Sequence, residues 1–288
     1  MSLIVYLNGE YVPLKDARIP VMDRGFLFGD GVYELIPVYG DRIFRLDEHL
    51  ARLQNSLDAI DIPNPHSDEE WETLIENVLS ENPGSDHRSV YIEVTRGVGE
   101  RDHLYEQQLK PTVFILCRPV IARDLSGGVS VITHPDIRWD YCHIKAISLL
   151  PGVLLKNHAR NTGGAHEAIL IRDGEVTEGA ASNVFIVSNG IVATPPKDNR
   201  LLPGITRDLI VELLEGAGIK CEERVVTESD LNKAEEIWIT SSVMEIAPVV
   251  RLDGRTLGNG APGSMWQRVH ELYEAFKQRM IAPLAEGN

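Results

Sequence analysis

The sequence predicts a mixed α/β (α+β) chain folded as two domains with hairpin-rich mixed sheets. Its 288 residues suffice for two domains that each bury a core. Short apolar runs interrupted by Asn-Gly, Gly-Asp or Asp-Gly pairs recur in both halves, which is typical of hairpins and disfavours a doubly wound parallel sheet. We expect a smaller N-terminal domain at 1–118, an interdomain segment at 119–128, and a larger C-terminal domain at 129–288 that carries Lys145.

The N-terminal half begins with two expected hairpins. Residues 4–12 form two short apolar runs around an Asn-Gly pair, and residues 31–46 repeat the pattern around Gly-Asp. Strands are expected at 88–97 and 111–118. The polar segment GVGERDHLYEQQ between them, with glycines at its start, is expected to be a loop.

Two helices are expected between these hairpins and strands. In the segment 47–60 and the residue before it, apolar side chains recur at steps of four and three and form one stripe: Leu46, Leu50, Leu53, Leu57 and Ile60. The segment 67–79 begins with Ser67 and Glu70, which together make a capping box.

The C-terminal half alternates short strands with helices. Strands are expected at 129–135, 143–148 and 236–242, with a run of short strands at 167–196. Helices are expected at 151–165, 204–220 and 265–280. In neither half does a GxGxxG or GxxxxGK[ST] motif follow a strand, so the common dinucleotide and nucleoside-triphosphate loops are not expected.

Composition restricts the classes of partner. The chain is 43% hydrophobic and 25% charged, with a formal net charge of -15, which disfavours nucleic acid and anionic membranes as partners. The three cysteines are widely spaced and lack metal-ligand spacing, so neither a disulfide framework nor a metal site is expected. The first residues lack the pattern of a signal peptide, and no apolar run could span a bilayer, so a cytoplasmic protein is expected.

Lys145 stands in a stretch that is almost entirely apolar from Ile144 onward. Burying an ammonium group is costly unless it is paired or loses its proton. One interpretation is a surface lysine on an edge strand. The other is an amine held neutral so that it can attack a carbonyl. The lysine alone does not decide between them.

Two other motifs carry groups that would make such an amine useful. Glu178 precedes the small residues 179–182, where a flat ligand could approach the backbone, although an exposed turn glutamate has the same pattern. Pro-Gly before a helix leaves the N–H groups of Ile205 and Thr206 free for an anion, although Thr206 could equally be an ordinary N-cap. Hydroxyls at a strand end and an arginine on the first helix could add to this site: Ser241, Ser242 and Arg52.

These motifs in this order resemble the fold-type IV pyridoxal-phosphate enzymes, which include D-amino-acid transaminases, branched-chain transaminases and aminodeoxychorismate lyase. The resemblance covers nearly the whole chain, from DRGFLFGDGVYE through DEHLARL, the lysine segment, EAILIRDGEVTEGAASNVF and LPGITRD to ITSSVMEIAPV. It implies pyridoxal 5'-phosphate as cofactor, small amino-acid and 2-oxo-acid substrates, and a homodimer with sites near the subunit boundary.

The resemblance also implies residue roles. Lys145 binds the cofactor aldehyde as a Schiff base and then moves the Cα proton, while Glu178 keeps the pyridine nitrogen protonated. Leu202 packs against the ring. The phosphate is held by Arg52, Ser241, Ser242 and the backbone of Ile205 and Thr206.

The loop between the expected strands at 88–97 and 111–118 indicates the branch of the family. Arg101 and His103 match the Arg-x-His pair that binds the substrate α-carboxylate in D-amino-acid transaminases, and Tyr33 matches the tyrosine that joins them. Leu150 occupies a position that is commonly tyrosine in branched-chain transaminases. We therefore expect ping-pong transfer of an amino group from a D-amino acid, such as D-alanine or D-glutamate, to pyruvate or 2-oxoglutarate.

Four other interpretations stay open at this point. A branched-chain L-amino-acid transaminase and aminodeoxychorismate lyase use the same lysine, cofactor and glutamate. A cofactor-independent lysine Schiff-base enzyme, or a binding protein for phosphorylated ligands, would also retain a phosphate site. Neither of these last two accounts for Glu178 together with an intact Lys145.

Overall fold

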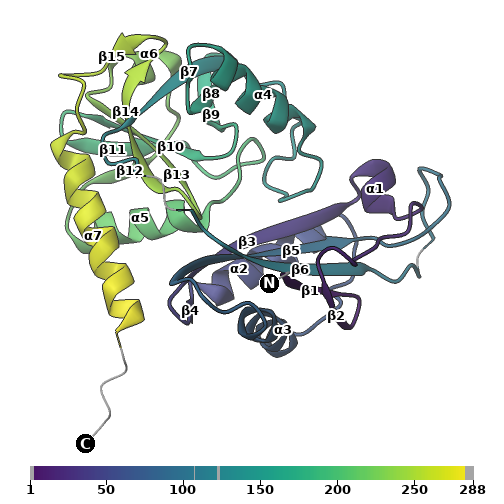
Figure 1. Ribbon diagram of the computed structural model, residues 1–288. Coiled ribbons are helices and arrows are strands. Elements are labelled where there is room, and N and C mark those ends of the chain that lie inside the picture. The colour runs from purple at the N-terminus through teal and green to yellow at the C-terminus, as the bar shows by residue number, and fades with distance from the viewer. Residues whose placement is uncertain (1–2, 107, 122–123, 283–288) are drawn as a thin grey trace, which may run out of the picture. The chain divides into compact units, whose positions relative to one another are not determined.

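The computed structural model describes residues 3–106, 108–121 and 124–282 (Figure 1). The predicted mixed α/β class is confirmed, because the chain builds two separate sheets and packs helices against them. Part of the expected interdomain segment 119–128, residues 122–123, lies outside the described residues.

The chain divides into two compact units that are not simply consecutive in sequence. Unit 1 comprises Met1–Ile121 and Ile144–Leu149, and unit 2 comprises Ala122–His143 and Leu150–Asn288. Lys145 therefore belongs to unit 1, whereas the sequence analysis placed it in the C-terminal domain. The reason is tertiary, because the lysine segment hydrogen-bonds to a strand that lies more than a hundred residues earlier.

Unit 1 is built on a six-stranded sheet in the order β2-β1-β6-β5-β3-β4, with every neighbouring pair antiparallel. Its strands are β1 (Ile4–Leu7), β2 (Glu10–Pro13), β3 (Gly31–Tyr39), β4 (Arg42–Ile43), β5 (His87–Thr95) and β6 (Thr112–Pro119). Both predicted hairpins are confirmed. At the first turn Asn8 and Gly9 have φ of 51° and 102°, and at the second Gly40 has φ of 59°, which are the backbone conformations that such turns require.

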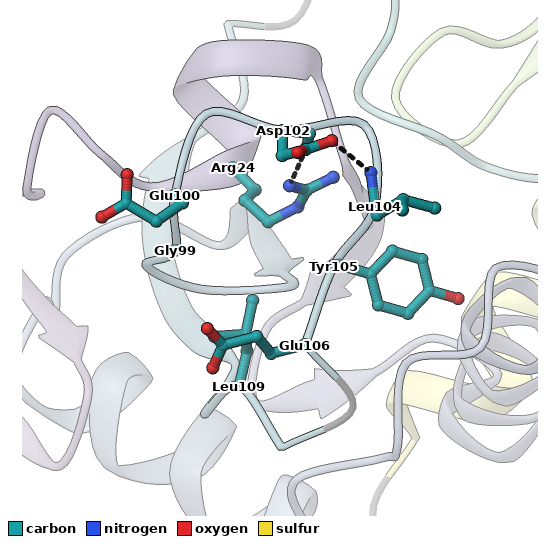
Figure 2. A pocket seen from close by; sticks show the side chains of 8 residues that line it. All are labelled: Arg24, Gly99, Glu100, Asp102, Leu104, Tyr105, Glu106 and Leu109. Carbon is teal, nitrogen blue, oxygen red and sulfur yellow. Dashed lines mark hydrogen bonds between the residues drawn. The ribbon is translucent and has the colours of Figure 1, made fainter.

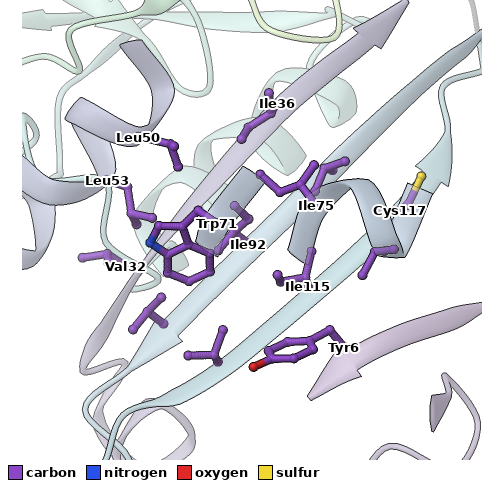
Figure 3. Packing of buried hydrophobic residues seen from close by; sticks show 14 of the residues in the cluster. Tyr6, Val32, Ile36, Leu50, Leu53, Trp71, Ile75, Ile92, Ile115 and Cys117 are labelled. Carbon is purple, nitrogen blue, oxygen red and sulfur yellow. The ribbon is translucent and has the colours of Figure 1, made fainter. Parts of the chain in front are cut away.

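Two helices cover one face of this sheet: α2 (Leu46–Asp58) and α3 (Asp68–Ser80). The apolar stripe of α2 is buried against the strands, and the predicted Ser67–Glu70 capping box at the start of α3 is confirmed. Figure 3 shows the side chains of both helices, among them Leu53, Trp71 and Ile75, packed over the sheet. This core holds unit 1 together through apolar burial.

The predicted strand at 143–148 is wrong. Within this segment only Ala146 makes a ladder pair, with Val32, and Ile147 N donates to Gly31 O at 3.0 Å. The short β4 pairs only with the end of β3, so the lysine segment lies beside the part of the β3 edge that β4 does not reach. Its apolar character therefore reflects packing on unit 1 rather than a strand of its own.

Unit 2 is built on a nine-stranded mixed sheet in the order β12-β11-β10-β13-β14-β7-β8-β9, with β15 paired to β14. Its strands are β7 (Val129–Pro135), β8 (Glu167–Arg172), β9 (Glu175–Gly179), β10 (Asn183–Ser188), β11 (Ile191–Thr194), β12 (Cys221–Glu223), β13 (Glu236–Ser241), β14 (Glu245–Leu252) and β15 (Arg255–Thr256). Three neighbouring pairs are parallel: β11–β12, β14–β7 and β7–β8. This agrees with the prediction that the chain does not form a doubly wound parallel sheet.

The helices of unit 2 are α4 (Leu150–Asn161), α5 (Ile205–Gly216), α6 (Glu228–Lys233) and α7 (Ser264–Ile281). The predictions of α4, α5 and α7 are confirmed, and α4 is followed by Gly163 and Gly164 with φ of 71° and 73°. Sequence reasoning missed α6, β12, β14 and β15, and also the five-residue α1 (Arg24–Phe28) of unit 1. No helix in the described part of the chain combines the length and apolar character needed to cross a bilayer.

Candidate active site

Lys145 is half-buried in unit 1 and is positioned by its backbone. Its N–H donates to Ser56 Oγ at 3.2 Å, and its carbonyl accepts from Tyr33 N at 2.9 Å. Its Nζ lies 4.2 Å from the centroid of the Tyr33 ring. Among the described residues, the structure records no carboxylate ion-paired with this amine. The amine is therefore held against an aromatic face and is available to a ligand.

Tyr33 belongs to a short aromatic row on the sheet of unit 1. Its ring lies 5.6 Å from that of Tyr91, whose hydroxyl donates to Glu93 Oε2 at 2.6 Å. Burial, and then the hydrogen bond to Glu93, raise the pKa of Tyr91 far above its ordinary value. Tyr33, one of the three predicted substrate-binding residues, thus lies directly beside the predicted catalytic lysine.

Arg52 is buried on α2 and forms an ion pair that the sequence analysis missed. Its Nε and Nη2 donate to the two carboxylate oxygens of Glu34 at 2.7 and 2.8 Å, and His49 Nδ1 lies 2.8 Å from Glu34 Oε2. Burial alone would raise the pKa of Glu34, but Arg52 and His49 hold it well below its usual range. The alternation of β3 could have indicated that Glu34 points into the core, where a partner is needed. Arg52 is thus oriented by Glu34, and its phosphate role stays a prediction.

Arg101 and His103 lie on the loop between β5 and β6, and both side chains are exposed. The Arg101 guanidinium carbon is 5.7 Å from the centroid of the Phe28 ring, and the His103 ring is 5.7 Å from the same centroid. The two side chains therefore share one aromatic neighbour, as their spacing of two residues in an extended loop allows.

A cavity of about 260 Å³ lies under the same loop (Figure 2). It is bounded by Arg24 on α1 and by loop residues between 99 and 109, including Asp102 and Tyr105. Figure 2 shows the Arg24 side chain pointing at the main chain of Asp102. Sequence reasoning did not single out Arg24.

Glu178 is buried in unit 2 at the end of β9, and both of its carboxylate oxygens have partners. Oε1 accepts from Arg138 Nη1, and Oε2 accepts from Asn183 Nδ2 and Leu202 N, each at 3.1 Å. Burial raises the pKa of Glu178 to about 7, although Arg138 opposes the rise. This excludes the exposed turn glutamate that the sequence allowed.

Arg138 is the principal residue that sequence reasoning missed in unit 2. It binds Asp136 through Nε at 3.0 Å and Nη2 at 2.8 Å, and it donates to the carbonyl of Arg200 at 3.0 Å. The spacing of Asp136 and Arg138 could have indicated this pair in the sequence. Side chains two residues apart on an extended segment point to the same side, so the acid and the arginine can meet. The pair holds the guanidinium where it meets Glu178.

The start of α5 is an open helix N-terminus, as an anion site requires. Its N-cap is Gly204, which supplies no side-chain cap, so Thr206 is not the N-cap that the sequence also allowed. The Thr206 hydroxyl is buried and has no hydrogen-bond partner among the described residues. A Cβ at Gly204 would collide with Oδ1 of Asn183, which is a hydrogen-bond partner of Glu178. The start of the helix therefore lies close to Glu178 and its partners. A phosphate oxygen would satisfy both the hydroxyl and the free N–H groups of Ile205 and Thr206.

The remaining predicted phosphate residues lie where β13 ends. Ser241 is the last residue of the strand, and its Oγ accepts from Met244 N at 3.4 Å, while Ser242 begins the turn. Leu202, the predicted ring contact, precedes α5 and donates its N–H to Glu178. Unit 2 therefore brings together the predicted acid, the ring contact and the open helix end.

The chain is similar to known aminotransferases over nearly its whole length. The family described as amino-transferase class IV matches residues 31–252. The D-alanine aminotransferase of Bacillus licheniformis is 40% identical over 267 residues, which cover 92% of this chain and 94% of that protein. The structure of the branched-chain aminotransferase from Thermoproteus uzoniensis with norvaline has a TM-score of 0.90 and 26% identity, with 98% and 96% of the two chains covered. A hypothetical aminotransferase from Mycobacterium tuberculosis, in its PLP-bound form, has a TM-score of 0.83 and 27% identity, covering 94% and 98%.

Proposed function

Because the chain belongs to the class IV aminotransferase family, we propose that it transfers the amino group of a D-amino acid to a 2-oxo acid, with pyridoxal 5'-phosphate as cofactor. D-Alanine and D-glutamate are the donors, and pyruvate and 2-oxoglutarate are the acceptors. The observation that carries this proposal is the pair Arg101 and His103 on an exposed loop, whose side chains share Phe28 of α1 as an aromatic neighbour. The 40% identity to a D-alanine aminotransferase supports the same branch.

The side chains present fit this cofactor. The half-buried amine of Lys145 suits an aldehyde, the buried carboxylate of Glu178 suits a ring nitrogen, and the open end of α5 suits a phosphate. We assign the cofactor to eight residues: Lys145, Arg52, Glu178, Leu202, Ile205, Thr206, Ser241 and Ser242. When bound, the cofactor supplies an electron sink for the carbanion that forms when the substrate loses its Cα proton.

The chain's own residues then have distinct tasks. Lys145 Nζ takes the Cα proton as a base and returns a proton as an acid. Glu178 holds a proton on the ring nitrogen, and Arg138 keeps Glu178 in place and favours its ionised form. The same lysine serves both half-reactions, so ping-pong kinetics are expected.

Selection of the D-enantiomer follows from where the substrate carboxylate binds. The guanidinium of Arg101 can donate a fork of hydrogen bonds to that carboxylate, and His103 and Tyr33 add donors. Once the Cα–H bond points to Lys145 and the carboxylate position is given, one direction remains for the side chain. Exchanging the carboxylate and side-chain positions would invert the accepted enantiomer without moving the lysine.

We propose that the protein acts as a homodimer. Unit 2 exposes two aromatic side chains whose rings are 5.5 Å apart, Trp139 and Tyr141, and an apolar row on α4. The row consists of Leu150, Val153 and Leu154, which are 67%, 51% and 54% exposed. A second copy of the chain would remove this surface from water. Sedimentation should therefore give twice the chain mass, and monomers at micromolar concentration would contradict the proposal.

A cytoplasmic location is part of the same proposal. Cys117, Cys142 and Cys221 are all free thiols, which suits a reducing compartment. Cell fractionation with an antibody tests this, and recovery in a secreted fraction would contradict it.

The decisive experiment is a substrate screen of the purified protein with pyridoxal phosphate. D- and L-alanine, D- and L-glutamate and L-leucine are each paired with pyruvate or 2-oxoglutarate. Turnover of the D-amino acids is the expected result. Transamination of L-leucine with D-alanine ignored would replace the proposal with a branched-chain transaminase. Pyruvate formed from aminodeoxychorismate would identify the lyase, and a protein without a visible absorption band would argue against the cofactor.

A further inference from the structure

Arg24 is a charged side chain that is 3% exposed in unit 1, and the tasks proposed above give it no role. It begins the short helix α1, whose N-cap Asp23 accepts from Gly25 N. A buried guanidinium is costly unless its donors are satisfied. The partners of its donors therefore indicate the structural role of this side chain.

The partners of Arg24 connect the body of unit 1 to the loop. Its Nε donates to Asp30 Oδ2 at 2.8 Å, and its Nη1 donates to the carbonyl oxygen of Asp102 at 2.7 Å. Asp102 is the residue between Arg101 and His103. This carbonyl belongs to the peptide between Asp102 and His103, so the hydrogen bond holds the main chain that joins the two residues of the Arg-x-His pair.

Aromatic contacts reinforce the connection. The Arg24 guanidinium carbon lies 4.7 Å from the centroid of Phe28, the ring that Arg101 and His103 also approach, and 5.8 Å from that of Tyr105. One side chain thus contacts both the aromatic neighbour of the pair and the loop that carries it.

A second arginine, Arg96, holds Asp30, the acidic partner of Arg24, in place. Arg96 binds both oxygens of Asp30, at 2.8 and 3.0 Å, and lies 3.7 Å above the ring of Tyr105. It also donates to the carbonyls of Ile60 and Asp61 in the turn that follows α2. Because Asp30 keeps this partner, removing Arg24 does not leave a buried carboxylate unpaired.

The main chain of the loop has no regular secondary structure to fix its conformation, so the bond from Arg24 can contribute to its position. Residues 99–106 form no helix or strand, and the cavity of about 260 Å³ lies beneath them. At the start of the loop, Gly99 N donates to Met22 O at 3.2 Å. Further along, the bond from Leu104 N to Asp102 Oδ1 at 3.0 Å is local to the loop. The Arg24 bond instead spans 78 residues and ties the centre of the loop to α1.

We propose that Arg24 is a positioning residue that holds the loop so that Arg101 and His103 face the substrate carboxylate. This inference deepens the proposed function and rests on it. Arg24 does not touch the substrate. It acts through the Asp102 carbonyl, so its loss should weaken carboxylate binding while the lysine chemistry continues.

The test uses Arg24→Met, which keeps an apolar stem beside Phe28 but removes all donors. Hydrogen–deuterium exchange of the peptide covering 98–106 should become faster. KM for D-alanine should rise about 10- to 100-fold with kcat within about threefold, the scale of a misplaced binding group. Arg24→Lys, which lacks the fork, should restore the KM only in part.

Two comparisons isolate the mechanism. Arg18→Met is the matched control, since Arg18 is exposed and donates to the nearby carbonyls of Lys15 and Ala17, and it should change neither readout. In an Arg101→Ala background, Arg24→Met should raise KM little further, because the two act through one interaction.

The outcomes separate this inference from the proposed function. Unchanged loop exchange in Arg24→Met, or a fall in kcat as large as the rise in KM, would overturn the positioning role. Unchanged KM for D-alanine in Arg101→Ala would instead overturn the carboxylate assignment in the proposed function. Loss of the folded state in Arg24→Met, with Arg24→Lys folded and kinetically like the wild type, would show that Arg24 serves stability alone.

Discussion

Replacing Glu178 with glutamine changes one charge at the centre of the polar cluster of unit 2. The carboxylate accepts hydrogen bonds on both oxygens, from Arg138 on one and from Asn183 and Leu202 on the other. Glutamine has one acceptor oxygen and one NH₂ group. In either orientation its NH₂ faces a donor, so at least one hydrogen bond is lost while the side-chain volume is kept.

Two effects follow, and their magnitudes can be worked out separately. Turnover should fall by roughly 10²-fold or more, the scale of a lost general acid–base or electrostatic contribution. The free energy of unfolding of the variant should also lack one pH-dependent contribution, because the pKa of Glu178 in the wild type is raised from 4.5 to about 7 by burial. The unfolded chain releases this proton near pH 4.5, whereas the folded apoprotein keeps it until about pH 7.

The sign of the stability effect is therefore set. The contribution of Glu178 to folding is fully present below pH 4.5 and is lost as pH rises toward about 7. At about 1.4 kcal/mol per pKa unit, the loss is about 3 kcal/mol across this range. Glutamine does not titrate, so the free energy of unfolding of the variant should lack this component.

The assay compares wild type, Glu178→Gln and Glu175→Gln. Glu175 lies on the same strand but is one-third exposed and pairs with Arg200 at 2.7 Å, so its variant controls for a charge lost near the surface. Turnover of D-alanine and the visible band of the bound cofactor are measured first. Urea unfolding of the apoproteins at several pH values between 4.5 and 8 then gives the stability difference.

Two results would refute the reasoning. Equal turnover in Glu178→Gln and wild type would mean that this carboxylate does not support the chemistry. Parallel stability curves for the two proteins across the pH range would mean that burial does not raise the pKa of Glu178. The control should show neither the loss of turnover nor a pH-dependent difference.

Three further predictions concern the lysine, the carboxylate pair and the helix end. Borohydride reduction of the holoenzyme should place the pyridoxyl group on Lys145 by peptide mass mapping, and a label on any other lysine would show that the assignment is wrong. Arg101→Ala should weaken binding of D-alanine by about 2–5 kcal/mol if the pair is desolvated in the complex, and His103→Ala should weaken it less because an imidazole lacks the two-pronged donor fork of a guanidinium. Measured KM values check both, and an equal or larger effect of His103 would reverse their ranking. Gly204→Ala should lower cofactor affinity at least about tenfold, since the new Cβ collides with Asn183 where the helix N–H groups point, and equilibrium dialysis with unchanged affinity would exclude a phosphate there.

Local patterns in the sequence were enough to predict most elements. The hairpin turn at Asn8-Gly9, the apolar stripe of α2 and the capping box before α3 each depend on residues a few positions apart. Backbone preferences and helical periodicity act over that range, so they can be read without knowing the fold. Short elements such as α1 and α6 were missed because five or six residues show too little periodicity.

The candidate site divides in the same way. Lys145, Glu178 and the Pro-Gly segment before α5 could be singled out in the sequence, but each was also compatible with an ordinary structural role, and only the resemblance of all the motifs together to a known family implied their functions. Tyr33 lies beside Lys145 as a consequence of hydrogen bonds between β3 and a segment more than a hundred residues away. That segment looked like a strand by composition, and only its packing showed that it is not.

The partners of the charged side chains were decided by tertiary structure alone. Arg52 meets Glu34 and Arg138 meets Glu178 because the fold buries each pair, and Arg24 reaches Asp102 from 78 residues away. The sequence by itself determined which residue types were present and the local conformation around them. Which buried charge neutralises which other depends on distances between elements, because desolvation requires a partner but does not specify it until the chain has packed.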